Sequence, residues 1–102
     1  MKKIIDGKLY NTETAKAIGS TWDYPQGDFR HFDETLYKSR KGRFFLAGNG
    51  GPMTRYSRRC SDGSICGGAN IIPITEEEAR EWCEKNCSLE TYIAVFGEIK
   101  EA

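Results

Sequence analysis

The sequence lacks any apolar run longer than a few residues, and the apolar stretch within "MKKIIDGK" ends at Asp6. A helix that crosses a bilayer needs about 20 consecutive apolar residues, so we expect no contact with a membrane. A secretory signal is not expected either, because its apolar core is missing, and this favours a cytoplasmic protein. With 102 residues there is room for only one hydrophobic core, which predicts a single domain over 1–102.

Signatures of catalysis are scarce as well. His31 is the only histidine, and the chain has no H-E-x-x-H, G-x-S-x-G or phosphate-loop pattern. A general base needs a positioned partner residue, and no pattern in the sequence identifies such a partner for His31. The glycine run "GNGG" lacks the lysine and the following helix of a phosphate cradle. The prediction is therefore a protein that is not an enzyme, with a nuclease that acts on guide or target RNA as the alternative.

Net charge is also absent, since 15 basic and 15 acidic residues balance. The charges are nevertheless sorted along the chain: residues 30–59 carry a net +6, and residues 60–102 carry a net −6. Overall neutrality therefore excludes neither a cationic nor an anionic partner.

The hydrophobic pattern predicts an α+β fold, in which a small antiparallel sheet of β-hairpins packs against one N-terminal helix and a C-terminal helical pair. The hairpins are expected in "KKIIDGKLYN", with a turn at Asp6-Gly7, and in "ETLYKSRKGRFFLAG". The N-terminal helix is expected over 12–18, and 20–33 is expected as a loop that holds Trp22, Phe29 and Phe32 on the core. Thr75 and Glu78 form a capping box that begins the first C-terminal helix, and the second is expected over 89–96.

The basic segment "YKSRKGRFFLAGNGGPMTRYSRR" alternates cations with aromatic residues. That combination suits neutralisation of phosphates together with stacking on bases, so the segment is a candidate nucleic-acid-binding surface. The alternative is a solvated hairpin whose arginines pair with the C-terminal glutamates of the same chain. The candidate residues are Lys38, Arg40, Lys41, Arg43, Arg55, Arg58 and Arg59.

The C-terminal helices carry many glutamates, of which Glu77, Glu81 and Glu84 are the candidate partner-binding residues. A carboxylate-rich face commonly serves solubility alone. It can also occupy a cationic groove on a nucleic-acid-binding protein, with carboxylates where phosphates would lie.

Four cysteines have the spacing C-x5-C and C-x3-C, a loose match to a four-cysteine zinc site made of Cys60, Cys66, Cys83 and Cys87. In a reducing cytosol, free thiols are the alternative and disulfides are not expected. No cofactor is therefore predicted, with zinc as the other interpretation.

Three segments, "KKIIDGKLYNTETAKAIGS", "ETLYKSRKGRFFLAGNGGPMTRY" and "IIPITEEEAREWCEKN", together resemble a family of small proteins carried by phages, plasmids and conjugative elements of Firmicutes. Small accessory proteins of such elements are often counter-defence factors, and some similar ones are linked to inhibition of CRISPR–Cas9. The resemblance transfers no catalytic residues, and the family positions matching Cys83 and Cys87 are usually not cysteine.

The resemblance implies an anti-CRISPR-like inhibitor in the cytoplasm of the host bacterium. Its expected partner is a host defence effector such as Cas9 or its guide RNA. Lys/Arg-rich channels of such effectors hold nucleic acid largely through its backbone, so the acidic face could block a channel while the basic hairpin touches guide RNA. The alternative function is that of a DNA- or RNA-binding accessory protein that uses the basic hairpin. The oligomeric state is left open.

Overall fold

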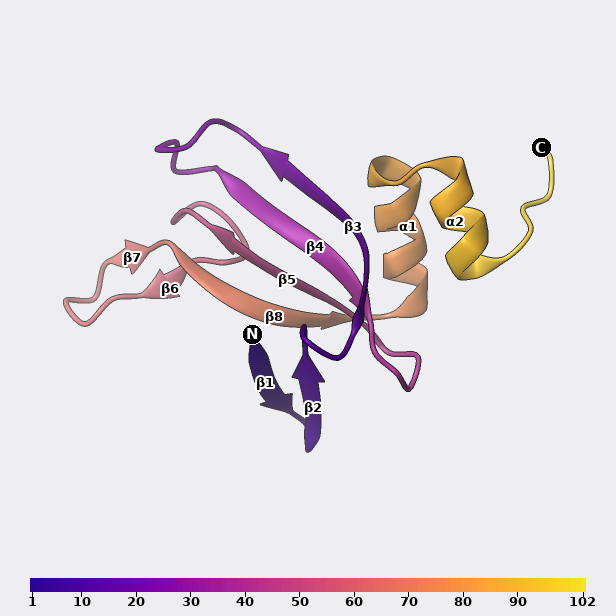
Figure 1. The fold of residues 1–102 in the computed structure, drawn as a ribbon. Coiled ribbons are helices and arrows are strands. Elements are labelled where there is room, and N and C mark those ends of the chain that lie inside the picture. Colours follow the sequence, from indigo (N-terminus) through magenta and orange to yellow (C-terminus); the bar gives the residue numbers. More distant parts are fainter.

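Eight strands precede two helices along the chain (Figure 1). The computed structural model describes all 102 residues, and it confirms the predicted α+β class with antiparallel sheets and a C-terminal helical pair. The elements are β1 (Lys2–Ile5), β2 (Lys8–Asn11), β3 (Lys16–Asp23), β4 (Phe32–Lys38), β5 (Phe44–Gly50), β6 (Arg58–Arg59), β7 (Ile65–Cys66), β8 (Gly68–Ile74), α1 (Glu76–Asn86) and α2 (Leu89–Phe96).

The main sheet has four antiparallel strands in the order β3-β4-β5-β8, with smaller sheets formed by β1-β2 and β6-β7. Both predicted hairpins are present. Asp6 and Gly7 have φ angles of 52° and 74°, which is the left-handed conformation that a two-residue turn requires. Pro73 lies in β8, an edge strand, as its missing N–H predicts.

The predicted N-terminal helix over 12–18 is wrong. Its presumed cap, Thr12, instead exchanges hydrogen bonds with Met1, accepting from the terminal amine at 2.9 Å and donating to the carbonyl oxygen at 3.2 Å. The chain then turns and enters β3, which pairs with β4 from Lys16 to Asp23. Pairing with a neighbouring strand outweighs the helix propensity of Ala15 and Ala17, because propensity is only a weak local preference.

The predicted loop over 20–33 is also wrong in two respects: its first residues form a strand, and two of the aromatic side chains expected on the core are exposed. Residues 20–23 belong to β3, and β4 begins at Phe32. Trp22 is 68% exposed and Phe29 is 66% exposed, so neither holds the segment on the core.

The core has two parts, one on each face of the main sheet. Since successive side chains of a strand point to opposite faces, Phe44 and Leu46 of β5 face the helices while Phe45 and Ala47 face the β1–β2 hairpin. On the helix side, Leu36, Ala79, Trp82 and Cys83 complete a buried cluster. On the other side, Phe45 packs edge-to-face against Tyr10, with ring centroids 5.4 Å apart. The sheet therefore holds α1 on one face and the β1–β2 hairpin on the other.

The helical pair begins as predicted. The backbone N–H of Glu78 donates to the Thr75 hydroxyl at 3.1 Å, and the Thr75 N–H donates to the Glu78 carboxylate at 3.0 Å. Thr75 alone separates β8 from α1. Helix α2 spans Leu89–Phe96, the predicted range, and its apolar Leu89 and Ile93 are 66% and 42% exposed. Neither helix is long and apolar enough to cross a membrane.

One buried carboxylate joins β4, the loop after β5 and helix α1. Glu34 is only 5% exposed, and its two oxygens accept hydrogen bonds from the Tyr56 hydroxyl at 2.7 Å and the Trp82 indole N–H at 2.8 Å. Burial, followed by the hydrogen bond to Glu34, raises the pKa of Tyr56. The phenol therefore stays protonated and remains a donor.

Candidate functional site

The seven candidate basic residues do not form one surface. Three of them, Arg40, Lys41 and Arg43, lie in or beside the β4–β5 turn, and Lys38 precedes that turn with its ammonium over the Phe44 ring, 5.4 Å from the ring centroid. The other three lie in two different places.

Arg55 lines a pocket with Glu78 and Glu81 of α1. Arg58 and Arg59 form β6, at the end of the molecule far from the helices (Figure 1). The structure therefore divides the predicted nucleic-acid surface into three parts.

The β4–β5 turn forms one wall of a groove of about 440 Å³, and the β1–β2 hairpin forms the other. Four cations and no carboxylate line this groove: Lys8, Arg40, Lys41 and Arg43. Lys8 was missed by the sequence analysis, because it is separated from the basic segment by about thirty positions and only the packing of the hairpin brings it near. Two hydroxyl-bearing residues, Thr14 and Ser39, also line the groove.

The acidic candidates Glu77, Glu81 and Glu84 are all exposed on α1. Their i, i+4, i+7 spacing places them along one side of the helix, with about 10 Å between the first and the last along its axis. None of the three takes part in an ion pair within 4.0 Å.

The alternative in which the basic segment pairs with the C-terminal glutamates is not what the structure shows. The three ion pairs are local, namely Arg30–Asp28, His31–Asp33 and Arg80–Glu76. Two residues of the basic segment share pockets with glutamates of α1: Arg55 lies with Glu78 and Glu81 around a pocket of about 270 Å³, and Arg43 lies with Glu76 around one of about 330 Å³. The pKa of Glu78 is lowered mainly by hydrogen bonds from the Thr75 backbone and hydroxyl, and only last by the charge of Arg55.

The four cysteines do not gather at one place. Cys60 and Cys66 form a disulfide in the β6–β7 hairpin, with Cα atoms 5.9 Å apart, whereas Cys83 and Cys87 lie on α1 and at its end. Figure 1 shows these two regions at opposite ends of the sheet. The expectation of four free thiols is therefore wrong, because Cys60 and Cys66 are joined in a disulfide. The two pairs lie too far apart to form the four-cysteine zinc site, and no cluster of three or more His, Cys, Asp or Glu is placed to hold a metal ion.

Cys83 and Cys87 form a pair of free thiols with their sulfur atoms 3.1 Å apart. Burial, followed by the hydrogen bond with Cys87, raises the pKa of Cys83 to about 12. Since the thiolate is the reactive form, the raised pKa lowers the reactivity of Cys83 at neutral pH.

At pH 8 we expect iodoacetamide to alkylate Cys83 at least about a hundredfold more slowly in the folded protein than in the unfolded chain. Mass spectrometry of the labelled peptides over time, with and without denaturant, measures both rates. Cys87, which is half-buried, provides an internal comparison in the same peptide map. Equal rates for Cys83 in the two states would contradict the burial of this thiol.

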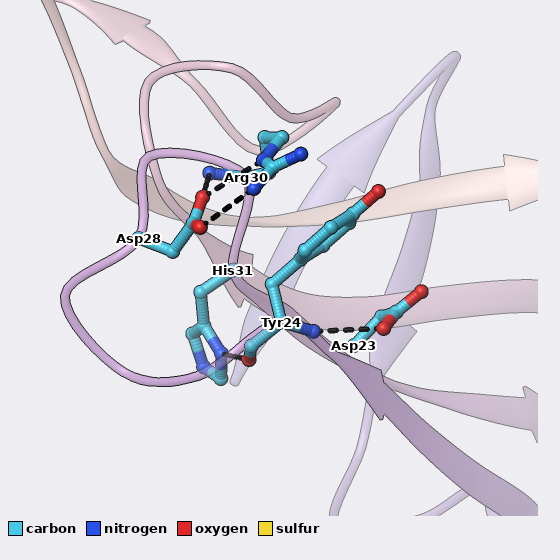
Figure 2. A network of polar contacts seen from close by, with 5 residues as sticks. All are labelled: Asp23, Tyr24, Asp28, Arg30 and His31. Atoms are coloured by element: carbon cyan, nitrogen blue, oxygen red, sulfur yellow. Dashed lines mark hydrogen bonds and ion pairs between the residues drawn. The ribbon is translucent and has the colours of Figure 1, made fainter.

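Exposed aromatic and cationic groups at the β3–β4 connection were also missed by the sequence analysis, which assigned Trp22 and Phe29 to the core and gave no role to Tyr24 or Arg30. The guanidinium of Arg30 lies over the Tyr24 ring, 4.2 Å from its centroid, and is held by the Asp28 carboxylate at 2.9 and 3.0 Å (Figure 2). Met53, 68% exposed, lines the same pocket as Tyr24 and Arg30. Trp22 in β3 and Phe29 in the connection are also exposed.

The polar network of Figure 2 fixes the shape of this connection. Asp28 accepts from the side chain and backbone of Arg30, which lower the pKa of this carboxyl to about 2. The ring nitrogen Nδ1 of His31 lies 2.7 Å from the Tyr24 carbonyl oxygen. Tyr, Trp and Arg side chains of this kind are enriched among residues that dominate protein–protein binding, so the connection offers contact area for a protein partner.

The structure thus offers a basic groove, an acidic helix face on the other side of the sheet, and an exposed aromatic connection. Comparison of the chain with protein-family models, curated proteins and solved structures finds no match.

Proposed function

We propose that this protein is a non-enzymatic counter-defence inhibitor encoded by a mobile element, which binds a host effector of the Cas9 type through charged surfaces. The observation that carries the proposal is the absence of any ion pair between the acidic face of α1 and the basic residues of the sheet. Each charged surface is therefore free to contact a partner. The origin in a mobile element rests on the resemblance of three sequence segments.

The acidic face supplies the contact with the effector protein. Glu77, Glu81 and Glu84 project from a helix that the buried Ala79, Trp82 and Cys83 hold on the sheet. Because the helix is packed along its apolar side, ordering the glutamates costs less entropy than ordering a flexible acidic tail. A channel that binds nucleic acid through lysine and arginine contacts to phosphates is complementary to such a row of carboxylates.

Reversing the three charges of the acidic face by Glu77→Lys, Glu81→Lys and Glu84→Lys is expected to raise the concentration needed to protect a target DNA from Cas9 cleavage by at least about tenfold. Purified protein, an effector loaded with guide RNA and a plasmid target suffice for the measurement. The matched control is a triple reversal of equal charge elsewhere, Glu90→Lys, Glu98→Lys and Glu101→Lys, all exposed.

The control variant is expected to inhibit as the unmodified protein does. Equal loss in both variants would mean that overall charge, and not the face of α1, is responsible. Cleavage that proceeds unhindered with the unmodified protein, together with no co-elution from an effector, would remove the proposal.

The basic groove favours a second candidate function, that of an accessory protein that binds DNA or RNA. Such a protein would bind nucleic acid without the effector and would leave cleavage unaffected.

A further inference from the structure

The groove between the β1–β2 hairpin and the β4–β5 turn is lined by four cations and by no carboxylate. None of its four cations, Lys8, Arg40, Lys41 and Arg43, takes part in an ion pair within the chain. Asp6 and Glu13 adjoin lining residues in sequence but do not line the groove, and Glu76 shares a separate pocket with Arg43 without forming an ion pair with it. Cations that converge in this way repel one another, and a bound anion would relieve that repulsion.

Both walls of the groove are held in place before any ligand binds. In the β4–β5 turn, the Ser39 N–H donates to the Arg43 carbonyl at 2.8 Å, and the Arg43 N–H donates to the Ser39 hydroxyl at 3.0 Å. The opposite wall is anchored by the packing of Tyr10 on Phe45 and by a hydrogen bond of 2.6 Å from the Lys3 ammonium to the Asn70 side chain. The backbone that carries the cations therefore needs little ordering on binding.

We propose that this groove binds the phosphate groups of a single-stranded nucleic acid. The inference rests on the proposed function, in which charged surfaces bind the effector. It adds Lys8 to the basic candidates and leaves out Lys38, Arg55, Arg58 and Arg59. Guanidinium groups of Arg40 and Arg43 match phosphate oxygens in a two-pronged geometry, and the ammonium groups of Lys8 and Lys41 add point charges.

The size and lining of the groove are consistent with the backbone of a single strand. Its volume of about 440 Å³ lies within the range of sites that hold small ligands, which suits a short stretch of one strand. Tyr10, the only aromatic residue that lines the groove, is 7% exposed and packs edge-to-face against Phe45, so it offers little surface for a base to stack on. Binding is therefore directed to the backbone and independent of base sequence.

The test is fluorescence anisotropy of the full chain with a labelled single-stranded RNA of about ten nucleotides, titrated at several salt concentrations. The affinity of the unmodified protein is expected to fall with salt with a logarithmic slope of about −2 to −3, since each contacted phosphate contributes about −0.7. The double variant Arg40→Ala, Lys41→Ala is expected to bind at least tenfold more weakly at low salt, with a slope reduced in magnitude by about 1.4.

The matched control is Arg58→Ala, Arg59→Ala, which removes the same charge at the far end of the sheet. This variant is expected to keep both the affinity and the salt slope. Equal weakening in the two variants, or no binding by the unmodified protein at low salt, would overturn the inference. An unchanged thermal midpoint in each variant shows that folding is intact.

Two competitors distinguish a strand from an isolated phosphate. Unlabelled RNA is expected to displace the probe, whereas inorganic phosphate and a mononucleotide at the same phosphate concentration are not. Displacement by the small anions would overturn the assignment to a strand. This measurement contains no effector, so its failure is distinct from a failure to inhibit cleavage.

Discussion

Replacing Glu34 with alanine is expected to lower the free energy of unfolding by about 3 kcal/mol. The change leaves two buried donors, the Tyr56 hydroxyl and the Trp82 indole N–H, without their acceptor. Each orphaned donor costs about 1 to 3 kcal/mol, because it has lost its hydrogen bonds to water without gaining another partner. Urea unfolding followed by tryptophan fluorescence measures the loss, since Trp82 is 8% exposed and changes its environment on unfolding.

Two further variants make this test specific. Glu34→Gln keeps one acceptor oxygen, so its expected loss is intermediate. Asp33→Ala removes the neighbouring carboxylate, whose side chain is 48% exposed, and is expected to cost less than about 1 kcal/mol. A loss for Glu34→Ala as small as that for Asp33→Ala would show that the carboxylate does not hold the sheet, loop and helix together.

Replacing Gly48 with alanine is expected to destabilise the protein by about 3 kcal/mol or more. Gly48 lies on β5 directly opposite Glu34 of β4. A Cβ atom there would collide with the Asp33 carbonyl oxygen and lie 2.9 Å from the Glu34 Cα atom. Both obstacles are backbone atoms of a paired strand, so the clash is relieved only by separating β4 from β5. The midpoint and slope of urea unfolding measure the effect.

Gly19→Ala is the control for this prediction, because the added Cβ atom there meets a milder obstacle. The Cβ atom there would meet the Cys87 sulfur at 3.0 Å and the Trp82 ring at 3.6 Å, which are side-chain atoms that can shift. We expect a smaller loss than at Gly48, and a smaller one still when Cys87→Ala is added. A Gly48→Ala protein as stable as the Gly19→Ala protein would mean that the central strands tolerate a wider spacing than the structure has.

Most of the fold was predictable from local sequence signals. The Asp6-Gly7 turn, the capping box of Thr75 and Glu78, and the stop at Gly97 are each encoded within a few residues, and all three are present as predicted. The prediction of an N-terminal helix failed because Lys16–Asp23 forms its hydrogen bonds with β4, which begins nine residues after Asp23. A short stretch with alanines cannot reveal that competition.

The candidate site was harder to predict from the sequence than the fold was. The basic segment was recognised, but its division among the β4–β5 turn, the α1 side and β6 depends on how the chain crosses the sheet. Lys8 joins the groove through tertiary packing alone. Trp22 and Phe29 were assigned to the core because large aromatic side chains are usually buried, and their exposure is visible only in three dimensions.

The single residue Thr75 between β8 and α1 has a consequence for a ligand that combines protein and RNA. With no flexible linker, the glutamate face and the cation-lined groove keep a constant separation and orientation on the two sides of the sheet. If one surface docks as proposed, the other is presented to the same complex at a high effective concentration, and the two weak contacts multiply into avidity. That gain requires the complex to offer its sites at the matching span, so geometry as well as charge would select the partner.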